Sequence, residues 1–254
     1  MPLQKLQFRP GLNREGTDYS NEGGWYDGDK IRFRSGFPEK IGGWTQFSAS
    51  TFYGVCRSLW NWVTLKSAVL VGLGTSQKYY VENGTIYNDI TPIYYTDSLV
   101  GPFTVGYSTL SSAITATDTS LTVASGTNFP NAGVLLIDSE KIAYTTKTVN
   151  TFSGLTRGYG GTTASSHAGG SNVATYSVLV TDAGYAPNTG DWVIFTGAAA
   201  VGGITVSGEY QIQSIQSTTN QYVILAASPS TSNATGGGTV TTQYEYPIGL
   251  DVAT

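Results

Sequence analysis

Apolar and polar residues alternate over short stretches along this chain, and no window of useful length places apolar residues at helical spacing. The stretches are rich in Val, Ile, Thr and Tyr, which favour strands. In the first hundred residues the pattern predicts strands at 30–34, 57–63, 68–72, 78–82 and 85–88. Between the last two, Asn83 and Gly84 predict a tight hairpin, because both residue types tolerate a positive φ.

The second half of the chain also shows short alternating stretches separated by turns. The segment VLLIDSEKIAYTT predicts a strand, a turn at Ser139 and Glu140, and a second strand with Ile142 and Tyr144 on one face; a glycine-rich return follows. Later strands are predicted at 192–196, 210–215, 222–226 and 239–242. We therefore expect an all-β protein.

Gly101 and Pro102 mark a break, after which Ser, Thr, Ala and Gly dominate and Lys and Arg become scarce. We interpret residues 1–107 as a partial β-propeller-like platform domain, although fewer than two blades fit before Val100. The platform is expected to resume at 244–254. Two small sandwich-like or barrel-like modules, at 108–176 and 177–243, are expected to be inserted into it. The ending suggests the front of a longer polypeptide.

Composition narrows the class of protein. Charged residues make up 12% of the 254 residues, about half the usual share. The 17 Tyr, 5 Trp and 9 Phe provide more apolar surface than disordered chains carry. One Cys and one His exclude an internal disulfide framework and a structural zinc site within one chain. No apolar run reaches the roughly 20 residues of a membrane span, so neither secretion nor membrane insertion is expected.

Charge is divided unevenly. Residues 1–97 hold ten Lys and Arg against nine acids, whereas the remainder holds three against eight. Neither part has the strongly basic character of a protein that grips nucleic acid through its phosphates.

The most informative segment is YDGDKIRFRSGFPEKIGGW, residues 26–44. Together with residues 8–10 and 21–25, it resembles the N-terminal region of the tail nozzle proteins of short-tailed phages, also called packaged-DNA stabilisation proteins. The likeness extends more weakly through roughly the first hundred residues and resumes at YEYPIGLDV, residues 244–252. The glycine-rich return after residue 154 resembles small β modules that recur in phage tail and baseplate proteins.

This resemblance implies a virion structural protein, made in the host cytoplasm, that catalyses no reaction and needs no cofactor. It implies about six copies in a ring below the portal and adaptor proteins. Double-stranded DNA would pass through the lumen without being read in sequence. Tail fibre or spike proteins would be further partners.

The basic residues of this segment are the candidate contacts. Alternation places Lys30, Arg32 and Arg34 on one strand face, opposite Ile31 and Phe33. With Lys40, these cations would contact DNA phosphates in the channel or the adaptor subunit. The favoured alternative is pairing within the chain, for which Asp27, Asp29 and Glu39 are the nearest acids.

Catalytic and metal motifs are weak. Asp27 and Asp29 are interpreted as turn residues, not as glycosidase carboxylates or calcium ligands. His167 follows Ser165 and Ser166, but no GxSxG elbow accompanies it, so a loop histidine is expected. The glycine runs at 158–161 and 236–238 lack the Lys-Ser/Thr of a phosphate loop and predict turns.

Aromatic residues support an alternative function. Tyr94, Tyr95 and Trp192 would stack sugars if they were exposed, which would make the chain a carbohydrate-binding or host-adhesion module of a phage tail. A capsule-degrading enzyme is a third option. Trp25, Trp44, Trp60 and Trp62 could serve in the same way. The favoured interpretation for all of these aromatics, Trp192 included, is a place in the core or at a subunit interface.

Overall fold

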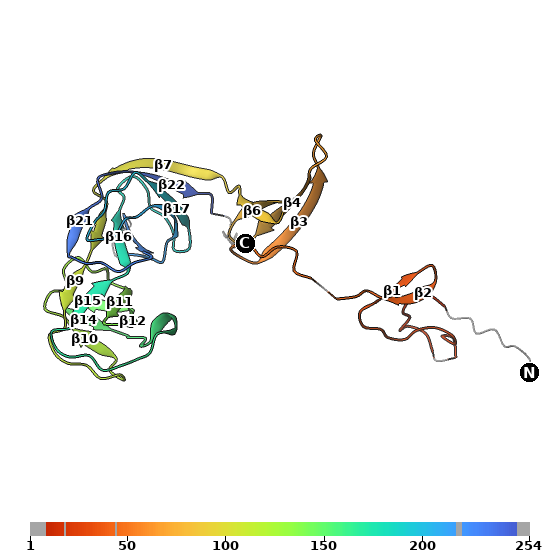
Figure 1. Ribbon diagram of the computed structural model, residues 1–254, viewed down its shortest axis with the longest axis horizontal. Coiled ribbons are helices and arrows are strands. Elements are labelled where there is room, and N and C mark those ends of the chain that lie inside the picture. Colours follow the sequence, from red (N-terminus) through yellow and green to blue (C-terminus); the bar gives the residue numbers. More distant parts are fainter. Residues whose placement is uncertain (1–8, 18, 44, 217–219, 248–254) are drawn as a thin grey trace, which may run out of the picture. The chain divides into compact units, whose positions relative to one another are not determined.

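The computed structural model describes residues 9–17, 19–43, 45–216 and 220–247 (Figure 1). These residues form antiparallel strands and a single 3-10 turn, η1 (Tyr159–Gly161), which confirms the all-β class. The chain divides into two compact units, one of Met1–Thr51 with Gly84–Ile86 and one of Phe52–Asn83 with Tyr87–Thr254. Within the described residues, no helix has the length and hydrophobicity needed to cross a membrane.

The first unit contains one hairpin, β1 (Ile31–Arg34) and β2 (Phe37–Lys40), joined at Ser35 and Gly36, whose φ values are 50° and 85°. Ile31 and Phe33 are half-buried whereas Arg32 and Arg34 are exposed, as the alternation predicts. A two-stranded ribbon has little core of its own. Trp44, an expected core aromatic, lies outside the described residues.

A four-stranded antiparallel meander follows, with strands that lie close to the predicted positions: β3 (Cys56–Val63), β4 (Val69–Thr75), β5 (Tyr79–Asn83) and β6 (Ile86–Asp89). The hairpin between β5 and β6 turns at Gly84 and Thr85, with φ of 61° and 76°, one residue later than predicted. A four-stranded meander is the building unit of a propeller blade, and the described residues contain one such sheet.

Strand β3 is unusual because all eight of its residues are exposed. It is an edge strand of its sheet, and it carries large apolar side chains. Trp60 is 75% exposed, and Leu59 and Val63 are each 64% exposed. A long apolar edge of this kind is a site for pairing with further protein.

Residues 93–105 and 177–245 form a β-sandwich, here called the carrier sandwich. Its two sheets enclose one core, with Phe103 and Val178 from one sheet meeting Phe195 and Val240 from the other. The first sheet contains, in order, β18 (Gly208–Gln211), β17 (Trp192–Thr196), β22 (Thr239–Glu245) and β7 (Ile93–Val100). The second contains β19 (Ser214–Ile215), β20 (Gln221–Leu225), β16 (Ser177–Thr181), β8 (Phe103–Val105) and β21 (Ala234–Gly236).

The predicted strand at 210–215 is divided in the structure. Strand β18 pairs with β17 in one sheet, whereas β19 pairs with β20 in the other. Ile212 lies between them and is buried in the core. The chain therefore changes sheets at a sandwich corner, where alternation continues although hydrogen-bonding partners change.

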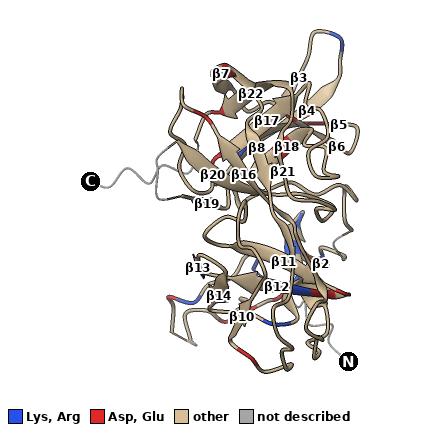
Figure 2. Cartoon of the chain, turned by 90° about the vertical axis from the view of Figure 1, so that its left-hand side faces the viewer, with Lys and Arg blue, Asp and Glu red and all other residues tan. Residues whose placement is uncertain are grey.

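Residues 107–175 form a second, smaller sandwich, here called the inserted sandwich. Leu135, Ile142 and Phe152 lie in its core. One sheet contains β12 (Glu140–Tyr144), β11 (Gly133–Ile137), β15 (Asn172–Thr175) and β9 (Tyr107–Thr109). The other contains β10 (Ser120–Thr122), β14 (Thr151–Ser153) and β13 (Thr146–Thr148). Figure 2 shows that charged residues are sparse along the strands of both sandwiches.

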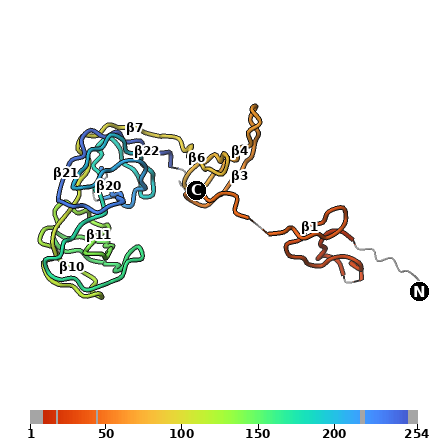
Figure 3. The backbone as a smooth tube through the Cα atoms, viewed as in Figure 1, coloured from red at the N-terminus to blue at the C-terminus, as the bar shows by residue number. Residues whose placement is uncertain are grey.

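Strand pairing shows where these sandwiches join. Strand β7 runs beside β22 for its full length, although nearly 140 residues separate them in the sequence (Figure 3). Strands β7 and β8, which lie in the expected platform, are therefore part of the carrier sandwich. Tyr244 and Glu245, the expected point of return to the platform, continue β22. The inserted sandwich interrupts the carrier sandwich between β8 and β16.

Candidate functional site

The best-defined polar site lies in the inserted sandwich, around the carboxylate of Glu140. The prediction of a turn at Ser139 and Glu140 was wrong by one residue: the turn comprises Asp138 and Ser139, with Asp138 at φ 53°. Glu140 is therefore the first residue of β12, and its side chain is fully buried on the same face as Ile142 and Tyr144.

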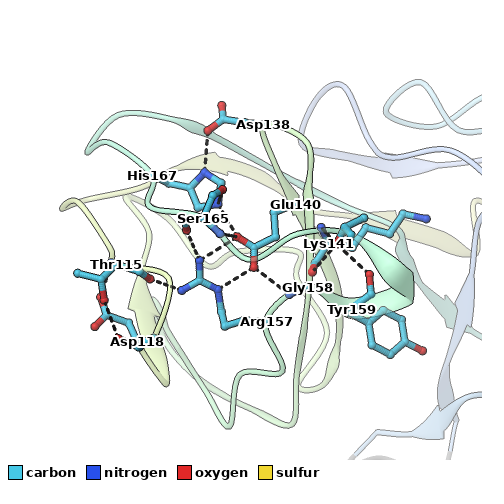
Figure 4. A network of polar contacts seen from close by, with 12 residues as sticks. Thr115, Asp118, Asp138, Glu140, Lys141, Arg157, Gly158, Tyr159, Ser165 and His167 are labelled. Carbon is cyan, nitrogen blue, oxygen red and sulfur yellow. Dashed lines mark hydrogen bonds and ion pairs between the residues drawn. The ribbon is translucent and has the colours of Figure 1, made fainter.

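Glu140 accepts hydrogen bonds from the whole glycine-rich return (Figure 4). Arg157 donates from Nε at 2.9 Å and from Nη2 at 2.8 Å. The backbone amides of Gly158 and Ser165 donate at 2.9 and 3.1 Å, and His167 Nε2 lies at 2.8 Å. Burial raises the pKa of Glu140, but the hydrogen bonds outweigh it and hold that pKa at about 2.

Arg157 also fixes the loop around it. Its guanidinium donates to the carbonyl oxygens of Thr115 and Ser165. The next residue, Gly158, has a φ of 63°, and a Cβ there would lie 2.7 Å from the carbonyl oxygen of Thr162. Glycine is therefore required at the point where the chain bends over the carboxylate.

His167 was expected in a loop, but the structure buries it and pairs its backbone with Ile114. Its Nδ1 lies 2.7 Å from Asp138 Oδ2, and Ser165 Oγ lies 3.5 Å from Nε2. Hydroxyl, imidazole and carboxylate thus follow one another as in a hydrolytic triad. Glu140 Oε2 also lies 2.8 Å from Nε2, so each ring nitrogen faces a carboxylate, and Nε2 is closer to Glu140 than to the Ser165 hydroxyl. The arrangement is an ion network.

A second network surrounds Lys78, which lies between β4 and β5 of the meander and contacts acids of the carrier sandwich. Its side chain is fully buried, and its Nζ lies 2.8 Å from both Asp89 Oδ2 and Glu245 Oε2 and also contacts Glu209. The ammonium is also 4.5 Å from the ring centre of Trp192. Burial lowers the pKa of Lys78, but the three carboxylates outweigh it and raise that pKa above its usual range.

Glu245 is the most buried of the three acids. Burial and a hydrogen bond with Glu209 raise the pKa of Glu245 to about 8. The oxygens of Asp89, Glu209 and Glu245 lie within 4.8 Å of one another, which is a metal-like spacing. However, the Lys78 ammonium takes the place that a divalent cation would occupy, so the cluster fits a structural ion network.

The predicted basic contacts do not share one face. Lys30 precedes β1 with a φ of 54°, and its Nζ lies 3.9 Å from Asp29 Oδ2. Arg32 pairs with Glu39 at 3.0 Å, as the favoured alternative predicted. Lys40 is opposite Ile31 in register, and is therefore on the face away from Arg32 and Arg34. Arg34 has no ion pair with a described residue.

The three predicted sugar-stacking aromatics differ in how far they are exposed to solvent. Trp192 is only 8% exposed, because Tyr53 and Lys78 cover it, so it is not a free stacking surface. Tyr95 is half-buried and stacks on Tyr185 at 5.0 Å. Tyr94 is 60% exposed.

Sequence reasoning missed both ion networks. For Glu140 a signal existed, because it occupies the inward position two residues before Ile142, where a lone acid must find partners. For Lys78 the partners are 11, 131 and 167 residues away, so no local pattern indicates them.

No family model matches this chain, and no curated protein matches it. A solved structure, the phage phi92 endosialidase, superimposes with a TM-score of 0.25 and 12% sequence identity, over 86% of this chain and 33% of that chain. The chain thus spans about a third of the length of that protein. A likeness this weak supports no argument about function.

We predict that Glu140 makes the inserted sandwich sensitive to acid. Because its pKa falls from an ordinary 4.5 to about 2 on folding, its stabilising effect is complete above about pH 5 and is lost as the pH falls toward 2. The loss should reach about 3 kcal/mol in the free energy of unfolding. Amide hydrogen exchange in residues 107–175, measured against pH, checks this.

The matched variants are Glu140→Gln and Asp138→Asn. Glu140→Gln should remove the acid dependence and destabilise the sandwich, because Arg157 loses its counter-charge while buried. Asp138→Asn, at a side chain that is 61% exposed, should cost less than about 1 kcal/mol. Equal effects of the two substitutions would contradict the central role of Glu140.

We predict that Lys78→Met destabilises the carrier sandwich by about 3 kcal/mol, because three carboxylates remain together without a counter-charge. Protonation relieves their repulsion, so the variant should gain stability as the pH falls from 8 to 5. Hydrogen exchange in β17, β18 and β22 measures both effects. Lys66→Met, in the exposed turn after β3, is the control and should change neither.

Proposed function

We propose that this chain is a non-enzymatic structural subunit of a phage tail, belonging to the nozzle that surrounds the DNA exit path below the portal and adaptor. The observation that carries the proposal is the linear resemblance of residues 21–44 to the N-terminal region of nozzle proteins. In the structure that segment forms the β1–β2 hairpin, with a charged face and an apolar face.

Exposed apolar surface supports assembly. Every residue of β3 is exposed, and the turn that follows exposes Leu65 as well. The β1–β2 hairpin also exposes Phe37, at 74%. Water-exposed aromatic and aliphatic groups in this number are typical of surfaces that another protein covers. Head-to-tail contacts that close after a fixed rotation would give a ring, and the resemblance suggests six copies.

The charges fit a channel that conducts DNA and does not bind it tightly. Among the described residues, Arg34 and Lys40 of the hairpin have no ion pair, whereas Arg32 is neutralised by Glu39. Few unpaired cations give weak, sequence-independent contact with phosphates. DNA held in such a lumen would remain free to slide.

No reaction is assigned in this proposal. The two polar clusters that resemble catalytic or metal sites, around Glu140 and Lys78, are occupied by their own ion pairs. Burying a matched ion network stabilises a loop or a sheet contact, and a subunit of a mechanical assembly needs such stability.

A symmetry-resolved image of the phage particle, with a tag on this chain, tests the proposal. A sixfold ring on the DNA axis, next to the portal and adaptor, is the expected result. Three copies on each peripheral spike would overturn the nozzle assignment.

We predict that Arg34→Glu, alone or with Arg32→Glu, lowers tail attachment or DNA retention. A reversed charge facing DNA or an acidic partner costs several kcal/mol, so the infectious titre should fall about tenfold or more. Lys40→Glu, on the opposite face of the same hairpin, is the matched control and should have little effect. Circular dichroism checks that all variants remain folded. An unchanged titre for both arginine variants would exclude this role for the hairpin.

A further inference from the structure

Two cavities lie at β18, the edge strand of the carrier sandwich, and residues of the meander and of the segment before it also line them. One has a volume of about 400 Å³ and the other about 460 Å³. Trp192 and Gln211 line both. Because they share these two residues, the cavities adjoin, and we treat them as two sections of one groove that meet at Trp192 and Gln211.

The first section combines polar side chains with one exposed ring. Arg57, Gln77 and Asp191 line it, together with Tyr246, which is 52% exposed. Arg57 has no ion pair with any described residue, so its guanidinium is available to a ligand. Such a lining offers both donors and acceptors, as a ring of adjacent hydroxyl groups requires.

The second section repeats this combination. Tyr53, which is 57% exposed, lines it together with Glu209 and Gln213. The Tyr53 ring lies 4.7 Å from that of Trp192, so packing against the indole fixes its orientation. Each section therefore has one exposed tyrosine beside carboxylate and amide groups.

We propose that this groove binds an oligosaccharide, with one pyranose ring in each section. The apolar face of a sugar packs on an aromatic ring while its hydroxyls bond to amide and carboxylate groups. Two adjoining sections with one exposed tyrosine each match a chain of sugars better than a single unit. Asp191 balances Arg57, and Glu209 is already paired with Lys78, so the groove has no excess of positive charge to hold a polyphosphate ligand. The proposal does not depend on the nozzle ring, since the groove belongs to one chain.

The test is binding of the full chain to an array of bacterial capsular and O-antigen saccharides, followed by calorimetry with the retained saccharide and its shorter fragments. The variants are Tyr246→Ala and Tyr53→Ala, one in each section. Tyr159→Ala is the matched control, because that tyrosine is 41% exposed on the inserted sandwich and lines neither section.

Each groove variant should weaken binding of the long saccharide by about three- to tenfold, the loss expected for one stacked ring. A fragment that fills one section should be sensitive to one of the two tyrosines only. Tyr159→Ala should bind as the unaltered chain does. The proposal is overturned if the array retains nothing, or if the long saccharide binds equally well to the double variant Tyr53→Ala/Tyr246→Ala.

Discussion

A buried charge must be matched by opposite charge and hydrogen bonds, and both sandwiches of this protein are organised around that constraint. In the inserted sandwich the matched charge is the Glu140 carboxylate, which accepts hydrogen bonds from two side chains and two backbone amides of one long loop. Where the meander meets the carrier sandwich it is the Lys78 ammonium, which contacts acids of β6, β18 and β22. Where local hydrophobic packing is thin, as in the loop of residues 154–171, the ion network replaces it.

The same constraint explains why residues that look chemically active are inert. Ser165, His167 and Asp138 follow one another in space, and three carboxylates gather within metal-binding distance of one another. In each case the group needed for chemistry is already engaged: the imidazole lies between two carboxylates, and the acids surround an ammonium. Whether a polar cluster in this fold is chemically active therefore depends first on whether its groups already have partners.

Different parts of the surface carry different kinds of side chain. Apolar side chains are exposed on the β3 edge and on the hairpin of the first unit, which is the pattern of a protein covered by other subunits. The groove at β18 exposes tyrosines beside amides and carboxylates, a pattern suited to hydroxylated ligands. A tail subunit that both assembles and contacts a cell surface would need both kinds of surface.

The sequence by itself determined the all-β class, the positions of the strands it predicted to within a few residues, and the pairing of cations in residues 30–40 with nearby acids, because period-two alternation and neighbouring charges are local properties. It misplaced two turns by one residue, at Gly84 and Asp138, since several adjacent residues tolerate a positive φ and the strand register selects among them. Only the tertiary structure decided that β7 joins β22, that Glu140 and His167 are buried together, and that Lys78 meets acids more than a hundred residues away. Those contacts depend on which sheet edges pair and how two sheets stack, and the alternation of one strand carries no information about its distant partner.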